Sequence, residues 1–291
     1  MIEEKSRNRG LEENYTKKRA VRIFAAGASI LSGIFFIIAF IFSFELETAL
    51  FKRGDMLFAA GSAICLISCL LCIAYCAFVI PKNKEEGQVL PEEIDKYERF
   101  YTLDSGAMKA ARCFCAGALL VEGIVRIYLL FSGKMSVLPA PAVAVLAVLL
   151  FIPLMMYFVP ELAAFTAPAY PKVHLVYGMV GILWFIANVI YSYFDRTIPL
   201  SSPYTLFIQI MLLAVMLAVV YEIKLHTDNP SPRMYLAFLC VAVILTGGFT
   251  LGRAAMLICG KVVSADDVAG IITSAGFAVY LFARLFYYRE D

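Results

Sequence analysis

The sequence predicts an all-α integral membrane protein, built as a bundle of about eight transmembrane helices. Hydrophobic residues make up 62% of the 291 residues and charged residues only 16%, whereas a soluble domain carries about a quarter charged residues. Eight apolar runs reach the roughly 20 residues that a helix needs to cross the hydrocarbon core. The runs are continuous rather than alternating, which argues against a β-barrel.

The eight expected spans are joined mostly by short loops. They cover residues 21–44, 56–80, 107–131, 140–158, 173–194, 203–223, 234–259 and 268–287. The first run is too long for a cleavable signal peptide and lacks a small-residue cleavage site after it, so we expect it to remain as a span. Pro153 and Pro160 interrupt the fourth span, and a proline can kink or end a helix.

Three loops carry helix-start signals. Ser202 and Ser231 each precede a proline, the order typical of an N-cap followed by proline at the first helical position. Residues 264–267 read Ser-Ala-Asp-Asp, which is similar to a capping box. These signals place the starts of the last three spans.

The distribution of Lys and Arg predicts the orientation, because these residues are retained on the cytoplasmic side. With an even number of spans both termini lie on one side, and that side receives 18 of the 25 Lys and Arg residues. The other side receives five, and the remaining two lie inside spans. We therefore expect a multi-pass protein of the cell membrane with cytoplasmic N- and C-termini. Topology accounts for the basic excess, so we expect no nucleic-acid partner.

The domain organisation follows from the spans. Residues 1–20 form a basic cytoplasmic N-terminal segment, and residues 21–291 form a single transmembrane domain. The longest loop, residues 81–106, is cytoplasmic, and Ile94, Tyr97 and Tyr101 within it share one helical face. Two interpretations stay open: a helix at the headgroup boundary, or a docking site for a cytoplasmic protein partner.

A weak internal repeat is visible in the spans. Residues 126–134 align without gaps to residues 253–261, and Arg, Leu, Gly and Lys coincide. A cysteine precedes each arginine by 13 residues. The match predicts two parallel four-helix halves, residues 21–168 and 169–291, related by an axis along the membrane normal. Chance similarity between apolar helices is the alternative.

Polar residues inside the spans are the candidate ligand-binding residues, because ionisable groups in a membrane cost several kcal/mol and mark functional sites. Glu122 and Arg126 lie four residues apart and share a helix face with small residues, which is typical of a helix–helix interface. The full candidate set falls in the outer half of the bilayer and comprises Glu122, Arg126, Asn188, Asp195, Gln209 and Arg253. Two arginines and two acids predict a nearly neutral, outward-facing polar site.

Several alternatives stand beside a ligand site. Arg126 and Arg253 lie about five residues from their helix ends, so each can instead extend to the headgroups or form a structural ion pair. The stripe of Cys65, Cys69, Cys72 and Cys76 fits helix packing better than a soft metal or a redox pair. Glu161, Glu222 and His226 near the cytoplasmic boundary are interpreted as helix-end residues or as an inner proton pathway.

The sequence therefore favours a transporter or solute-binding membrane protein with an outward-facing polar site. The expected partners are the lipid bilayer and a small polar or zwitterionic solute. The alternative is a membrane sensor or scaffold subunit that acts through a cytoplasmic partner. An intramembrane lipid-modifying enzyme is a minor alternative, since the sequence offers carboxylates but no nucleophile–base pair. We expect no enzyme activity, cofactor or metal, and the sequence has no Gly-rich phosphate loop.

Overall fold

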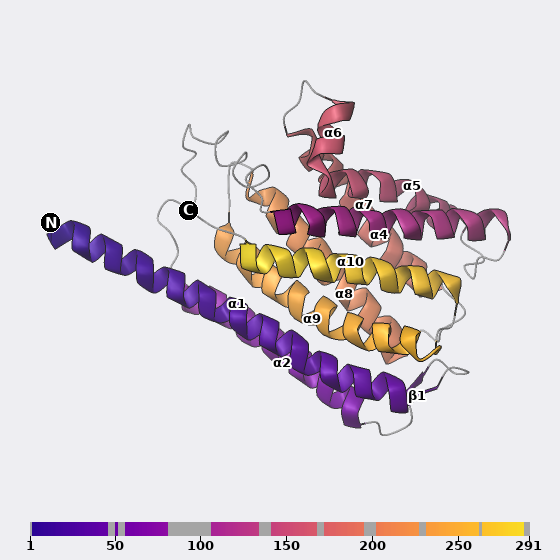
Figure 1. Cartoon of the computed structure of the whole chain (residues 1–291), viewed down its shortest axis with the longest axis horizontal. Helices are drawn as coiled ribbons and strands as arrows, with labels where there is room; N and C mark the ends of the chain where they lie inside the picture. Colours follow the sequence, from indigo (N-terminus) through magenta and orange to yellow (C-terminus); the bar gives the residue numbers. More distant parts are fainter. Residues whose placement is uncertain are drawn as a thin grey trace.

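The computed structural model describes residues 2–45, 50–51, 56–80, 106–133, 141–167, 172–194, 202–226, 231–261 and 264–287, with side chains from residue 15 onward except at 141. The helices and strands in chain order are α1 Ile2–Phe42, β1 Phe44–Glu45, β2 Leu50–Phe51, α2 Met56–Phe78, α4 Gly106–Phe131, α5 Pro141–Phe158, α6 Pro160–Thr166, α7 Val173–Phe194, α8 Pro203–Lys224, α9 Pro232–Ile258 and α10 Ala265–Tyr287. Most of the described residues are helical, and the long helices run roughly along one direction (Figure 1).

The architecture confirms the prediction of an all-α, multi-pass membrane protein. Within the described ranges, seven helices are long and apolar enough to cross a membrane, or eight when one bent pair counts as a span. Most helix ends fall within two or three residues of the expected span ends. The start of α1 is the main exception, because the helix continues N-terminally from the apolar run back to Ile2.

The fourth span is a broken helix. The α5 helix continues through Pro153 and ends at Phe158. Pro160 then starts α6, and the two helices meet at an angle of 108°. Pro160 lies in the first turn of α6, where its missing N–H costs no hydrogen bond. Of the two prolines, Pro160 therefore marks the break.

A short hairpin replaces the end of the first expected span. Phe44 pairs with Phe51 in an antiparallel ladder between β1 and β2, so the predicted helix ends at Phe42 rather than at residue 44. The rings of Phe40, Phe44 and Phe51 contact one another, with centroids 5.1–5.5 Å apart. Aromatic packing therefore favours the hairpin over one more helical turn.

The α9 helix lies at the centre of the bundle. It packs against α1, α2, α8 and α10, and 83% of its most apolar window is buried, against 33% for α2. Contacts also join α10 to α4, α4 to α5, α5 to α7 and α7 to α8. Six helices therefore close into a ring of α9, α10, α4, α5, α7 and α8, with the α1–α2 pair packed on the outside of α9.

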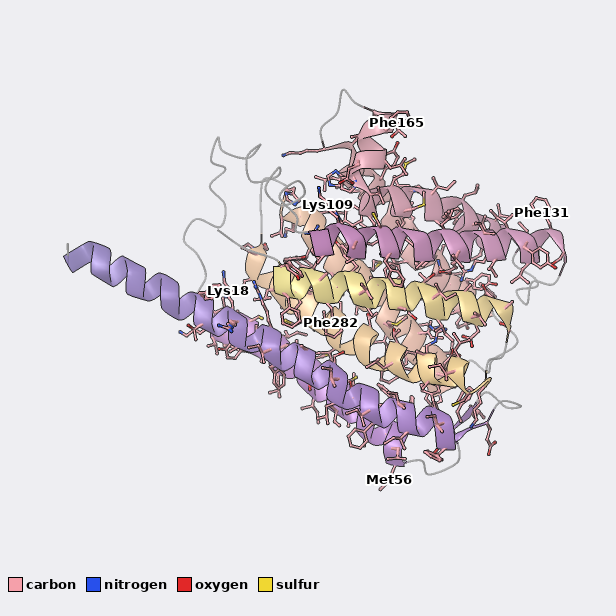
Figure 2. The ribbon with its side chains drawn as sticks, in the orientation of Figure 1. Lys18, Met56, Lys109, Phe131, Phe165 and Phe282 are labelled. Atoms are coloured by element: carbon pink, nitrogen blue, oxygen red, sulfur yellow. The ribbon has the colours of Figure 1, made fainter. Side chains whose placement is uncertain are left out.

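The beginning of α1 and the end of α10 lie toward the same end of the bundle. In Figure 1 both are on the left of the view. Lys18 and Lys109 lie toward that end in Figure 2, and Phe131 lies at the opposite end. We call these the terminal end and the far end. An even number of membrane crossings produces this arrangement.

Two predictions remain untested by the fold. Residues 81–105, which belong to the long loop predicted to be cytoplasmic and include the amphipathic stretch at 94–101, lie outside the described residues. The internal duplication also stays a prediction. Gly133 and Gly260, seven residues after the two matching arginines, both have positive φ angles, 65° and 69°. This likeness is local, because many helices end on a left-handed glycine.

Candidate functional site

Four of the predicted site residues meet at one cavity. Glu122 and Arg126 come from α4, Asn188 from α7 and Arg253 from α9, and all four line a cavity of about 90 Å³. Residues of α8 and α10 complete the lining. We call this space the polar cavity. It lies toward the far end of the bundle, because its α4 residues come from the half of that helix nearest Phe131.

The other two predicted residues have different outcomes. Gln209 does not line the polar cavity, but its Nε2 donates to Ser192 Oγ at 3.1 Å, and Ser192 is a lining residue. Gln209 therefore bonds to a side chain of the cavity lining without lining the cavity itself. Asp195 lies outside the described residues, so its predicted place in the site stays a prediction.

Arg126 connects three helices through its guanidinium group. Its Nη2 pairs with Glu122 Oε1 at 2.7 Å, one helical turn away on α4. Its Nε pairs with Asp266 Oδ1 of α10 at 3.0 Å, and its Nη1 donates to Asn188 Oδ1 of α7. The ring of Tyr191 lies 4.7 Å from the guanidinium carbon. Each nitrogen of Arg126 thus has an acceptor inside the protein.

Arg253 makes an equivalent connection among α8, α9 and α10. Its Nη2 pairs with Asp267 Oδ1 at 2.8 Å, and its Nε donates to Tyr204 Oη at 3.0 Å. Its Nη1 lies 3.4 Å from both Gly270 O and Ser274 Oγ. Tyr204 Oη in turn donates to Asp267 Oδ1. The pair is therefore bridged by a tyrosine as well as joined directly.

These contacts exclude the interpretation that the arginines extend to the headgroups. Arg126 is 7% exposed and Arg253 is 3% exposed. An arginine that reached a headgroup would leave its guanidinium in the interface and its stem against lipid. Here both guanidinium groups turn inward to carboxylates of α10. Buried ion pairs and a bound ligand remain as explanations.

The sequence did not predict that Asp266, Asp267 and Tyr204 bond to the two arginines. Asp266 and Asp267 lie in the first turn of α10, where we interpreted residues 264–267 only as a capping signal. That signal is real, since Ser264 Oγ accepts from the Asp267 N–H at 3.1 Å. Carboxylates in a first helical turn also interact favourably with the helix dipole. Tyr204 also belongs to the aromatic core, since its ring centroid lies within 6 Å of those of Phe40, Phe44 and Phe249.

The two aspartates change the charge balance of the site. Glu122, Asp266 and Asp267 supply three carboxylates, and Arg126 and Arg253 supply two guanidinium groups. The expectation of a nearly neutral site counted two acids, one of them Asp195. Among the described lining residues, the acids therefore exceed the bases by one when all are ionised.

Of the two other helix-start signals, one is confirmed as a capping hydrogen bond and the other is not. The Ser202 side chain accepts from Tyr204 N at 3.3 Å, which confirms this N-cap. Ser231 occupies the N-cap position of α9, but its side chain makes no capping hydrogen bond. Proline at the first helical position removes one N–H that such a cap would otherwise serve.

A separate buried ion pair lies toward the terminal end. Arg284 of α10 pairs with Glu222 of α8 at 3.1 Å. Tyr280 Oη donates to the same Glu222 oxygen, and Tyr235 Oη lies 3.5 Å from the other. Glu222 and Arg284 are 1% and 2% exposed. Glu222 is therefore a buried, paired residue in the last turn of α8.

The inner proton pathway receives little support from this geometry. Glu161 is 61% exposed and lies 3.6 Å from Arg112, a different arginine from the partner of Glu222. Burial, together with the nearby Arg284 and Lys172, lowers the pKa of His226 to about 3. His226 therefore stays neutral near pH 7 and does not readily carry a proton there.

The cysteine stripe packs into the bundle. Cys65, Cys69, Cys72 and Cys76 are all buried on one face of α2, which contacts α1 and α9. In the part of the chain that the structure describes, no group of three or more His, Cys, Asp or Glu side chains is arranged to hold a metal. Helix packing therefore explains this stripe.

Comparisons with protein-family models, with curated proteins and with solved structures gave no match to this chain.

Proposed function

We propose that this chain is a membrane transporter or solute-binding protein that takes a small polar solute into the polar cavity. The observation that supports this proposal is the convergence of buried charges from α4, α9 and α10 on one open cavity within the membrane-spanning bundle. Charged groups at such depth are costly and mark substrate or ion pathways. A purely structural network of ion pairs would need no open volume beside it.

The cavity has the size of a small-solute site. A buried water needs roughly 10–15 Å³ of such open volume, so about 90 Å³ accommodates several waters or a solute of a few heavy atoms. Polar groups and aromatic rings such as Trp184 and Phe277 both line it. This combination is typical of sites that hold small ligands.

A cavity-filling variant tests the proposal. Gly270 lines the cavity, and an added Cβ there would meet only Arg253 Nη2, at 3.4 Å. We expect Gly270→Leu to occupy the cavity without removing a charge, and so to abolish solute binding in a folded protein. The measurement is thermal unfolding in detergent against amines, amino acids, organic anions and nucleosides. A ligand at a hundred times its Kd stabilises the folded state by about 2.7 kcal/mol.

Gly117→Leu is the matched control. Gly117 lies exposed on α4, and an added Cβ there meets nothing within 4 Å. We expect this variant to respond to solutes as the wild type does. If no solute stabilises the wild type, or if Gly270→Leu responds equally, the polar cavity is not a binding site and the proposal is wrong.

We also propose that both termini face the cytoplasm and that the polar cavity opens to the outside of the cell membrane. The excess of Lys and Arg on the side of the termini supports this orientation. Cys259 offers a native test, since it is exposed at the end of α9 nearest the far end of the bundle.

We expect a membrane-impermeant maleimide to label Cys259 in intact cells. The Cys259→Ser variant supplies the background, because it removes only the thiol in question. Labelling of Cys259 that requires permeabilised membranes would reverse the proposed orientation and place the polar cavity on the cytoplasmic side.

A further inference from the structure

The two arginines of the polar cavity already bond to the protein through every guanidinium nitrogen. All three guanidinium nitrogens of Arg126 have acceptors, on Glu122, Asp266 and Asn188. The three nitrogens of Arg253 likewise have acceptors on α8 and α10. Each guanidinium nitrogen is therefore in contact with at least one protein acceptor, and the carboxylates among these acceptors offset the attraction of the arginines for an anionic ligand.

Four weaker donors in the lining also bond to the protein. Asn188 Nδ2 donates to Trp184 O at 2.9 Å, and Ser192 Oγ donates to Val189 O at 2.8 Å. Thr273 Oγ1 donates to Ala118 O at 3.3 Å, and Ser274 Oγ donates to Ile271 O at 2.9 Å. Each of these side chains donates one hydrogen bond to a backbone carbonyl.

Two acidic residues of the lining each have one carboxylate oxygen without a hydrogen-bond partner among the described residues. Glu122 Oε2 and Asp267 Oδ2 are buried and have no hydrogen-bond partner among the described residues. Glu122 is 3% exposed, and the Asp267 side chain is 7% exposed. An unsatisfied buried acceptor costs about 1–3 kcal/mol, and more when it is charged. A ligand that donates hydrogen bonds removes this cost.

We propose that the polar cavity binds the ammonium group of a small protonated amine, with Glu122 Oε2 and Asp267 Oδ2 as its acceptors. The inference rests on the proposed function and narrows the solute from polar or zwitterionic to cationic. The excess of one carboxylate over the guanidinium groups supplies the matching charge. Trp184 and Phe277 also line the cavity, and aromatic rings attract ammonium ions.

An ammonium group fits this site better than a bare metal ion. An ammonium needs only a few acceptors, since each N–H makes one hydrogen bond. A hard cation such as Ca²⁺ takes six to eight oxygen ligands, and the described residues present no group of three or more acidic or other metal-ligating side chains placed to hold one.

The test is direct binding of radiolabelled methylammonium to the purified wild-type protein at pH 7. We expect saturable binding that unlabelled ethylammonium competes for. We expect sodium, potassium and acetate, each added in large excess at constant ionic strength, not to compete. This measurement uses only the wild-type protein, so its result does not depend on whether a variant folds.

Two isosteric variants test the acceptors. Glu122→Gln and Asp267→Asn can each keep the oxygen that faces an arginine while replacing the free acceptor with an N–H₂ donor. We expect each variant to bind methylammonium about tenfold more weakly or worse, because a charge-assisted hydrogen bond is lost. Glu161→Gln is the matched control, since this exposed carboxylate lies outside the polar cavity, and it should bind as the wild type does.

The outcomes separate this inference from the proposed function. Stabilisation by an anion or a neutral solute, lost in Gly270→Leu and without methylammonium binding, would keep the cavity as a solute site and overturn the ammonium assignment. Competition by sodium or potassium that matches ethylammonium would also overturn it, in favour of an inorganic cation. Wild-type-like binding in both folded acceptor variants would overturn the assignment of Glu122 and Asp267. No binding by any solute class would reject both proposals.

Discussion

Arg253→Gln is expected to destabilise the folded protein by about 3–5 kcal/mol, because it leaves a buried charge without its partner. The guanidinium of Arg253 is 3% exposed and pairs with Asp267 Oδ1 at 2.8 Å. Its removal leaves the Asp267 carboxylate in the bundle with Tyr204 as its remaining side-chain donor. From sequence alone, neutralising an arginine would be expected to abolish binding without unfolding, and the ion pairs predict a different result.

The double variant Arg253→Gln/Asp267→Asn is the informative comparison. Removing both charges removes the uncompensated carboxylate, so we expect the double variant to recover most of the lost stability. The measurement is reversible unfolding in mixed detergent micelles, with Glu161→Gln as the exposed control expected to change stability by about 0.5 kcal/mol or less. A double variant as unstable as the single variant would mean that packing of the Arg253 stem, rather than its charge, stabilises the bundle.

The spans were predictable because the information for them is local. A run of about 20 apolar residues defines a crossing wherever it occurs in a chain, and α2, α4 and α7 begin within one residue of the expected positions. The ion pair between Glu122 and Arg126 is local as well, since four residues make slightly more than one helical turn. The structure confirms this pairing, with Arg126 Nη2 2.7 Å from Glu122 Oε1.

The partners of the arginines could not be predicted in the same way. Asp266 lies 140 residues from Arg126 along the chain, and their pairing depends on α10 packing against α4. The sequence of a single helix does not specify which other helices it packs against. Asp266 and Asp267 also precede the expected last span, which starts at residue 268, so they were treated as loop residues with a capping role.

The sequence did contain a signal for the central helix. A helix that is apolar on every side is buried on every side, and residues 234–259 contain few charged residues and three glycines at 247, 248 and 252. Glycines let neighbouring helices approach closely in a membrane. This pattern distinguishes α9 from α2, whose small residues lie mainly on one face.

The close approach of α1 to α9 leads to the second large expected effect. At Gly252 an added Cβ would lie 2.6 Å from Phe40 Cδ2 and 2.7 Å from Phe36 Cβ. Such distances are far shorter than a normal carbon contact of about 3.5–4.0 Å. Phe36 and Phe40 are both fully buried, so neither ring has open space to move into. A larger side chain at Gly252 must therefore separate the two helices.

We expect Gly252→Leu to destabilise the protein by about 3 kcal/mol or more, at the upper end of the range for overpacked cores. The cost includes the aromatic contacts that join α1 to its neighbours, since Phe36 meets Phe207 of α8 at 5.3 Å and Phe249 of α9 at 5.6 Å. Unfolding in mixed micelles measures the loss. Gly27→Leu on α1 is the matched control, because Gly27 is exposed and an added Cβ there meets nothing within 4 Å. If the two variants were equally stable, the α1–α9 contact would tolerate a larger side chain at Gly252, and the expected clash with Phe36 and Phe40 would be wrong.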